Sequence, residues 1–241
     1  MEGRHASLVT GASGAIGTAL ALELAGSGHD LTLTGRDAGR LQATADLVAS
    51  RDGGEVRIAS GDVRDVRHRR SLIGAHLATY GRLDVLVANA GSGRAAPLAQ
   101  TDDETIAAAT EVNLIAPFEL VRDALRPMLH QGQGWVVLTA SLSGIRPTEG
   151  VAAYSAAKAA MVSVARSVNL EHARDGVRAC ALCPGFVDTP MSAWTTDRVP
   201  PTEMLRPADM TAALRFLLSL SEAAVVDELV LTRAAAPPFA P

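Results

Sequence analysis

The sequence predicts a doubly wound α/β domain in which a mostly parallel, seven-stranded sheet lies between two layers of helices. Short runs rich in β-branched residues alternate with longer amphipathic stretches, and this repetition requires right-handed crossovers between parallel strands. Ligands bind to such sheets beyond the carboxyl ends of the strands. The expected strands cover residues 7–10, 30–34, 55–60, 83–89, 134–140, 177–183 and 227–232.

Amphipathic stretches with the apolar spacing of helices separate these strands. No segment indicates a second core, so we expect one domain over residues 1–232. The remaining segment, 233–241, contains "AAAPPFAP" and is expected to be a surface tail, because proline interrupts both strands and helices. The expected helices cover residues 15–26, 38–50, 65–80, 102–129, 151–173 and 207–219.

The composition argues against several classes of function. The net charge of -4 and the pI of about 5.9 leave no basic surface for nucleic acid. The N-terminal residues lack the features of a signal peptide, and no apolar run is long enough to cross a membrane. We therefore expect a soluble, cytoplasmic protein that binds neither nucleic acid nor membranes.

The two cysteines, Cys180 and Cys183, form a C-x-x-C sequence within an expected strand. Residues three apart in a strand point to opposite faces of the sheet, which does not suit a redox or metal pair. We interpret them as core cysteines of a protein from a reducing compartment, and we expect no metal site.

A glycine-rich segment, "LVTGASGAIG" at residues 8–17, lies between the first expected strand and the first expected helix. The free N–H groups and the dipole at such a helix start favour a pyrophosphate. The spacing matches neither the P-loop nor the strict G-x-G-x-x-G sequence, so the position of the segment supports the interpretation more than its spacing does. A flexible turn with incidental glycines is the alternative.

Tyr154 and Lys158 are four residues apart on an expected helix, which places them on one face. Lys158 is the only lysine among 22 basic residues, and a nearby ammonium lowers the pKa of a phenol toward neutrality. Ser141 follows a strand and could hydrogen-bond a substrate oxygen. Asn113 is expected in mid-helix, where asparagine is unfavourable unless its side chain has a role. A solvated helix surface is the alternative for the Tyr-Lys pair.

These residues stand among further motifs, and together they resemble the short-chain dehydrogenase/reductase family from about residue 6 to residue 232. The resemblance implies a Rossmann-type domain and a catalytic tetrad. Tyr154 would be the acid or base for the carbonyl or alcohol oxygen, and Ser141 would orient that oxygen. Lys158 would lower the pKa of Tyr154 and bind the nicotinamide ribose, and Asn113 would hold a water molecule. The motifs are "TGASGAIG" (10–17), "GDVRD" (61–65), "NAG" (89–91), Asn113, Ser141, "YSAAK" (154–158) and "PGFVDT" (184–189).

The same resemblance implies a set of cofactor-binding residues. Asp62 and Val63 would border the adenine, and residues 184–189 would cover the nicotinamide. Ala15 stands where many relatives have the middle glycine of the turn. The implied cofactor-binding residues are Gly11, Ser13, Gly14, Ala15, Ile16, Gly17, Arg36, Asp62, Val63, Asn89, Ala90, Gly91, Tyr154, Lys158, Pro184, Gly185, Val187 and Thr189.

The end of the second expected strand predicts NADP(H) as the cofactor. NAD-preferring relatives place a carboxylate there, whereas this chain has Thr34, Gly35 and Arg36. A guanidinium can pair with the 2′-phosphate of NADP(H), and Asp37 is better placed to cap the following helix. NAD remains the alternative, because Gly14 occupies the position at which many NADP-preferring relatives carry a second basic residue.

We therefore expect an NADP(H)-dependent oxidoreductase that interconverts a small-molecule carbonyl and an alcohol. An NAD-linked alcohol or 3-hydroxy acid dehydrogenase and a non-catalytic NADP(H)-binding regulator are the alternatives. Arg94 or Arg146 could bind an anionic substrate, although a solvated arginine is the favoured interpretation. The family builds dimers and tetramers on its long helices, so we expect a homodimer or homotetramer. Candidate pocket residues are Ser143, Ile145, Arg146, Val151, Met191 and Trp194.

Overall fold

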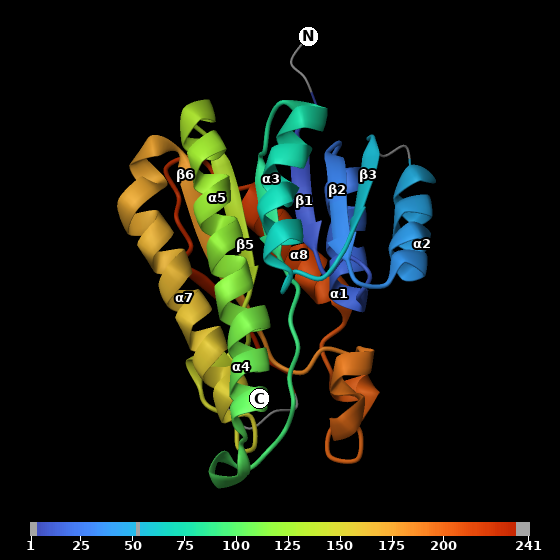
Figure 1. The fold of residues 1–241 in the computed structure, drawn as a ribbon, viewed down its shortest axis with the longest axis vertical. Helices are drawn as coiled ribbons and strands as arrows, with labels where there is room; N and C mark the ends of the chain where they lie inside the picture. The colour runs from blue at the N-terminus through green and yellow to red at the C-terminus, as the bar shows by residue number, and fades with distance from the viewer. Residues whose placement is uncertain (1–3, 52–53, 235–241) are drawn as a thin grey trace.

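The computed structural model describes residues 4–51 and 54–234. Its strands are β1 (Ala6–Thr10), β2 (Asp30–Gly35), β3 (Val56–Ser60), β4 (Val85–Ala88), β5 (Gly134–Thr139), β6 (Val177–Pro184) and β7 (Glu228–Leu231). They form one sheet in the order β3-β2-β1-β4-β5-β6-β7, and every pairing is parallel (Figure 1). Successive strands are added on one side of β1 as far as β3 and on its other side from β4 onward. The predicted doubly wound sheet is therefore confirmed.

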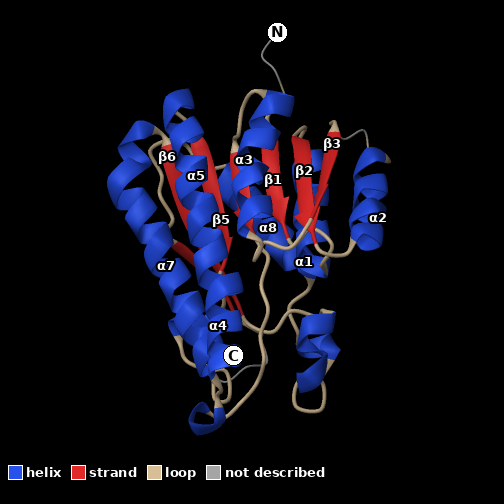
Figure 2. Cartoon of the chain, viewed as in Figure 1, coloured by secondary structure: helices blue, strands red, loops and turns tan. Residues whose placement is uncertain are grey.

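Helices cover both faces of the sheet (Figure 2). The helices are α1 (Ala15–Gly26), α2 (Ala38–Ala49), α3 (Val66–Tyr80), α4 (Asp103–Thr110), α5 (Ala116–Gln131), α6 (Leu142–Ile145), α7 (Ala152–His172) and α8 (Pro207–Leu218). Alternate strand residues point into two separate cores, one against α1, α2 and α8 and the other against α3, α5 and α7. Cys180 belongs to the first core and Cys183 to the second, and both are buried and free. Their interpretation as core cysteines is confirmed.

The expected helix over residues 102–129 is present as a helical run from Asp103 to Gln131, but it is not regular throughout. α4 ends at Thr110, and the π turn Glu111–Ile115 separates it from α5. Pro117 lacks the N–H that would bond the carbonyl of Asn113 in a regular helix, and its ring would clash with that carbonyl. The Asn113 side chain also donates a hydrogen bond to the carbonyl of Ala109 at 2.9 Å. The interruption therefore places Asn113 inside the π turn rather than in a regular helix.

Two short 3-10 helices, Pro190–Thr195 and Pro201–Glu203, lie in the connection from β6 to α8. The expected proline-rich tail begins at residue 233, and its residues 235–241 lie outside the described part of the chain. Within the described residues, no helix is both long enough and apolar enough to span a membrane.

Candidate active site

A cavity of about 910 Å³ lies at the carboxyl ends of the strands. All of the residues expected to bind a cofactor line it, as do three of the four tetrad residues. Asn113 is completely buried and is absent from the lining. The residues that the structure gathers here are Gly11, Ser13, Gly14, Ala15, Ile16, Gly17, Arg36, Asp62, Val63, Asn89, Ala90, Gly91, Ser141, Tyr154, Lys158, Pro184, Gly185, Val187 and Thr189.

The glycine turn presents the N-terminus of α1 to this cavity. Asp37 and Asp65 cap α2 and α3 with their carboxylates, but Gly14, at the N-cap of α1, provides no side-chain cap. The first turn of α1 also contains no acidic residue, so its amides are available to an anion. Gly11 has a φ of 64°, and a Cβ at Gly17 would collide with the Gly11 carbonyl.

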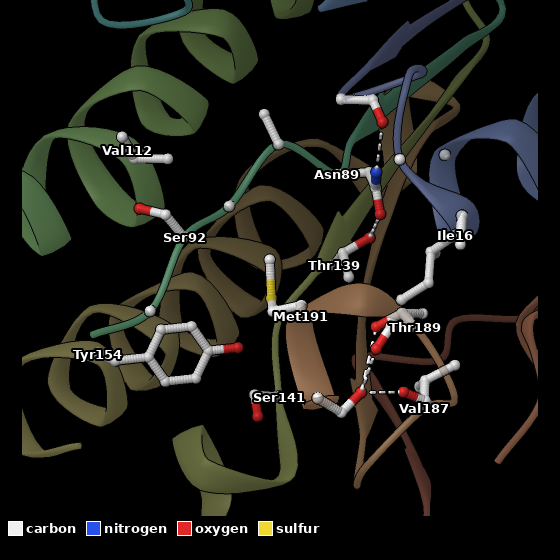
Figure 3. Close-up of a pocket in the computed structure, with 18 of the residues that line it drawn as sticks. Ile16, Asn89, Ser92, Val112, Thr139, Ser141, Tyr154, Val187, Thr189 and Met191 are labelled. Atoms are coloured by element: carbon white, nitrogen blue, oxygen red, sulfur yellow. Dashed lines mark hydrogen bonds between the residues drawn. The ribbon is translucent and has the colours of Figure 1, made fainter. Parts of the chain in front are cut away.

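Asn89 connects three strands next to this turn (Figure 3). Its Nδ2 donates to the carbonyl of Thr10 at 3.2 Å. Its Oδ1 accepts from the Thr139 hydroxyl at 3.1 Å, as Figure 3 shows. The Thr10 hydroxyl accepts from the backbone N–H groups of Asn89 and Ala90, each at 3.0 Å. The Asn89 side chain therefore fixes the ends of β1, β4 and β5 relative to one another.

Tyr154 and Lys158 project from the first two turns of α7. The Tyr154 hydroxyl points into the cavity, toward the side that holds Ser141 (Figure 3). Lys158 Nζ donates to the Thr139 carbonyl at 2.6 Å and lies 5.6 Å from the centroid of the Tyr154 ring. Ser141 is the N-cap of α6, and its Oγ accepts from the Ser143 N–H at 3.1 Å, which orients the hydroxyl.

Burial controls the protonation of this pair. Burial raises the pKa of Tyr154 above its usual value, and the Ser141 hydroxyl opposes that rise. Burial lowers the pKa of Lys158 to about 8. The resemblance implied that Lys158 lowers the pKa of Tyr154, whereas in the structure desolvation is the dominant cause and acts in the opposite direction.

Asn113 lies outside the cavity and hydrogen-bonds to Ser92, which lines it. Its Nδ2 donates to the carbonyls of Ser92 at 2.7 Å and Ala109 at 2.9 Å, and its Oδ1 accepts from the Ser92 N–H at 3.2 Å. A Cβ at Gly91 would lie 3.0 Å from Asn113 Oδ1 and 3.4 Å from Lys158 Nζ. The Asn113 side chain therefore fixes the segment beside the ammonium, and both of its amide protons are used within the protein. Its expected role in holding a water molecule stays a prediction.

The opposite end of the cavity is rich in arginine. Arg36, Arg40 and Arg64 line it and are exposed. Arg64 donates to the Asp62 carboxylate at 2.7 Å, and this hydrogen bond is the largest cause that lowers the pKa of Asp62. Asp37 accepts from the Arg40 N–H at 3.0 Å, as expected of a helix cap. Arg40 and Arg64 were not expected here, although Arg40 follows Arg36 by about one helical turn.

The wall beyond the tyrosine is mainly apolar. Met191 and Trp194 line the cavity and are 55% and 57% exposed, and the Trp194 ring packs edge-on against Phe186 at 5.9 Å. Ser143 and Val151 also line it, as expected. Three other candidates do not belong to the lining: Ile145 packs into the core against α5 and α7, and neither Arg94 nor Arg146 reaches the cavity wall.

Comparison with known protein families identifies the chain. A family model described as short chain dehydrogenase matches residues 5–199. The chain belongs to the short-chain dehydrogenase/reductase family. Among curated members of this family, it is 35% identical over 218 residues to the BbsC subunit of (2S)-[(R)-hydroxy(phenyl)methyl]succinyl-CoA dehydrogenase of Thauera aromatica, covering 88% of this chain and 86% of the relative.

Solved structures of the family agree with the fold. A variant of actinorhodin polyketide ketoreductase with NADPH superposes with a TM-score of 0.88 at 30% identity, covering 95% of each chain. An alcohol dehydrogenase from the archaeon Thermococcus sibiricus, complexed with 5-hydroxy-NADP, also has a TM-score of 0.88 at 30% identity, covering 97% of this chain and 98% of the other. The short-chain dehydrogenase/reductase described here is ketoreductase-like in its fold and its motifs.

Proposed function

We propose that this short-chain dehydrogenase/reductase reduces the carbonyl group of a small molecule to an alcohol with NADPH, and catalyses the reverse reaction with NADP⁺. The observation that supports this most strongly is the Tyr154 hydroxyl, directed into one cavity with Ser141 and Lys158. The balanced reaction joins a carbonyl, NADPH and a proton to give an alcohol and NADP⁺. The nicotinamide, when bound, supplies the hydride.

Several features of the cavity support the binding of a dinucleotide. The uncapped N-terminus of α1 suits the pyrophosphate, and Gly11 and Gly17 allow close approach of the backbone. Asp62 and Val63 border the proposed adenine end. At the other end, Lys158 would bind the nicotinamide ribose, and Thr189 would contact the carboxamide.

The chain's own residues would handle the proton. Its raised pKa keeps Tyr154 protonated at neutral pH, so its O–H can donate to the carbonyl oxygen as that oxygen gains electron density. The Ser141 hydroxyl would hydrogen-bond the same oxygen and fix its direction. The Lys158 ammonium would stabilise the tyrosinate left behind, and it is 5.6 Å from the ring centroid.

We propose NADP(H) rather than NAD(H) because of the arginines at the adenosine end. Arg36 and Arg40 line the cavity there, and guanidinium groups pair well with phosphates. The one carboxylate in that part of the lining, Asp62, already accepts hydrogen bonds from Arg64. A 2′-phosphate would therefore meet positive charge.

The substrate is proposed to be an uncharged ketone or aldehyde with an apolar body. Val151, Met191 and Trp194 line the region beyond the tyrosine, and the partial exposure of the last two leaves it open to solvent. Because Arg94 and Arg146 lie outside the lining, an anionic substrate would find no guanidinium on this wall.

NADPH oxidation with a panel of apolar ketones and aldehydes tests the proposal. We expect turnover with several of them, a higher kcat/KM with NADPH than with NADH, and loss of turnover in Tyr154→Phe. Tight NADPH binding without turnover of any carbonyl would instead favour the non-catalytic regulator. A preference for NADH would favour the NAD-linked alternative.

The proposed homo-oligomer would use the long helices. Ile115, the last residue of the π turn, and Phe118, in the first turn of α5, are 39% and 49% exposed, and Leu170 on α7 is 88% exposed. Large exposed apolar side chains of this kind are typical of subunit interfaces. Sedimentation of the full chain would distinguish a monomer from the proposed dimer or tetramer; the cytoplasmic location stays a prediction.

A further inference from the structure

A buried arginine on α3 joins three separate segments behind the cavity. Arg69 is 1% exposed. Its Nη1 donates to the Val63 carbonyl at 2.5 Å and to Glu111 Oε1 at 3.0 Å, and its Nε donates to Glu119 Oε2 at 2.7 Å. A buried guanidinium is stable only when its donors are satisfied, so this arginine holds the three acceptors in a fixed arrangement.

Two of these three contacts lead to the proposed site. Val63 lines the adenosine end of the cavity. Glu111 is the first residue of the π turn, and Asn113 lies two residues further along that turn. The third acceptor, Glu119, lies one helical turn beyond the π turn, in the first turn of α5, and does not line the cavity.

From the π turn, the contacts continue to the catalytic lysine. Asn113 accepts from the Ser92 N–H at 3.2 Å and donates to the Ser92 carbonyl at 2.7 Å. The neighbouring Gly91 is packed so closely that a Cβ there would lie 3.4 Å from Lys158 Nζ. A continuous set of contacts therefore runs from Val63, at the proposed adenosine end, through Arg69 and the π turn to the Gly91–Ser92 segment beside Lys158.

We propose that Arg69 is a positioning residue for the proposed reaction. Through Glu111 it holds the π turn, and with it Asn113, in register with the Val63 segment, so that one rigid unit bounds both ends of the cofactor cavity. This inference rests on the proposed function. π turns inside α-helices are rare and frequently occur at functional sites.

Two matched variants, Glu111→Gln and Glu119→Gln, test the role of this contact. Both glutamates contact the same guanidinium and both are partly exposed, with side-chain exposures of 35% and 22%. Each variant removes one charge and keeps the size of the side chain, whereas replacing Arg69 would leave both carboxylates unpaired and endanger folding. A difference between the two variants therefore reports on the π turn rather than on stability.

We expect Glu111→Gln to lower kcat about tenfold with the KM for NADPH within about twofold, since displacement of a catalytic group by about 1 Å costs on the order of 100-fold. Glu119→Gln should leave kcat and KM within about twofold. Equal losses of kcat in the two variants, or no loss in either, would overturn the proposal. So would a change in Glu111→Gln confined to KM.

Amide hydrogen exchange gives a readout that does not need turnover. We expect Glu111→Gln to speed exchange in peptides that cover residues 89–95 and 109–115, and Glu119→Gln to leave both at the wild-type rate. Unchanged exchange in Glu111→Gln would contradict the proposal even if its activity fell. If the wild type turned over no carbonyl, the proposed function would fail, while the exchange result would still decide whether Arg69 positions the π turn.

Discussion

The two ends of the cavity are built in opposite ways. At the proposed nicotinamide end, Lys158 and Asn113 are buried and hydrogen-bonded to the protein, and desolvation shifts the pKa values of Lys158 and Tyr154. At the proposed adenosine end, Arg36 and Arg40 are exposed. Electrostatic interactions are strong in the first environment and screened by water and salt in the second.

Under the proposed function, the first end carries out proton transfer and the second end determines the preference for NADP(H). Buried groups in fixed positions suit proton transfer, because a small change in their surroundings changes the pKa greatly. Exposed arginines contribute modestly to binding, so the cofactor preference is expected to change only a little with each substitution. Substitutions at the first end should therefore have large effects on kcat, whereas substitutions at the second end should have small effects on the preference for NADPH over NADH.

Replacing Tyr154 with phenylalanine should have the largest effect. Loss of the proton donor is expected to lower kcat about 100- to 10,000-fold, the usual contribution of general acid–base catalysis. Tyr80→Phe is the matched control, because it removes the only other tyrosine hydroxyl, which donates to the Leu31 carbonyl outside the cavity. Steady-state kinetics that gave equal activities for the two variants would contradict the proposed role.

Lys158→Met tests the burial of charge through stability. The folded-state pKa of Lys158 is about 8, against about 10.4 for an unfolded lysine. The ammonium therefore destabilises the folded wild type fully below pH 8, and this penalty disappears between about pH 8 and pH 10.4. The methionine variant lacks it at every pH.

Consequently, the free energy of unfolding of wild type relative to Lys158→Met should rise by up to about 3 kcal/mol between pH 7 and pH 10.4. Urea denaturation of both proteins across this range measures the difference, and titrations that the two proteins share cancel. A difference that stayed constant with pH would show that the ammonium is not desolvated.

The same pKa predicts a change in activity with pH. Because the pKa of Tyr154 is raised, Lys158 is the first of the two to lose its proton. For carbonyl reduction, kcat/KM should fall above about pH 8, approaching tenfold per pH unit. A profile that stays flat to pH 9.5 would mean that the ammonium is not required.

Arg36→Ala and Arg40→Ala should have the smallest effects. Each is expected to lower the ratio of kcat/KM for NADPH to that for NADH about three- to tenfold, as befits partly screened contacts with a phosphate. Arg67→Ala, which removes an exposed arginine of α3 outside the cavity lining, is the control and should leave the ratio unchanged. An unchanged ratio in both cavity variants would show that other residues determine the preference for NADPH over NADH.

Local patterns predicted most of the fold and the position of the site. The glycine turn and the Tyr154–Lys158 spacing are short-range features. The parallel sheet brings the residues that follow the carboxyl ends of its strands together in one cavity. The π turn was missed although Pro117 indicated it, because Asn113 within that turn contacts Ser92 in another segment. Contacts between distant segments leave little trace in one sequence.

Arg40 and Arg69 were also missed, for different reasons. Arg40 lines the cavity from the first turn of α2, and the sequence alone does not show which way that turn faces. Arg69 looks in the sequence like one more surface arginine of α3, since nothing local predicts two carboxylates from another helical region beside it. Conversely, Ile145 and Arg146 follow Ser141 closely in sequence yet do not line the cavity, because α6 directs them away from it.

The central claim is that this cavity transfers hydride to a carbonyl carbon while Tyr154 provides the proton. Turnover with 4-deuterated NADPH, carrying the label on the transferred side, followed by mass spectrometry of the product, tests it most directly. We predict one deuterium on the carbinol carbon with the wild type and with Tyr80→Phe, and a product yield reduced at least about 100-fold with Tyr154→Phe. NADPH consumption without deuterium in the alcohol, or undiminished labelling by Tyr154→Phe, would contradict the account.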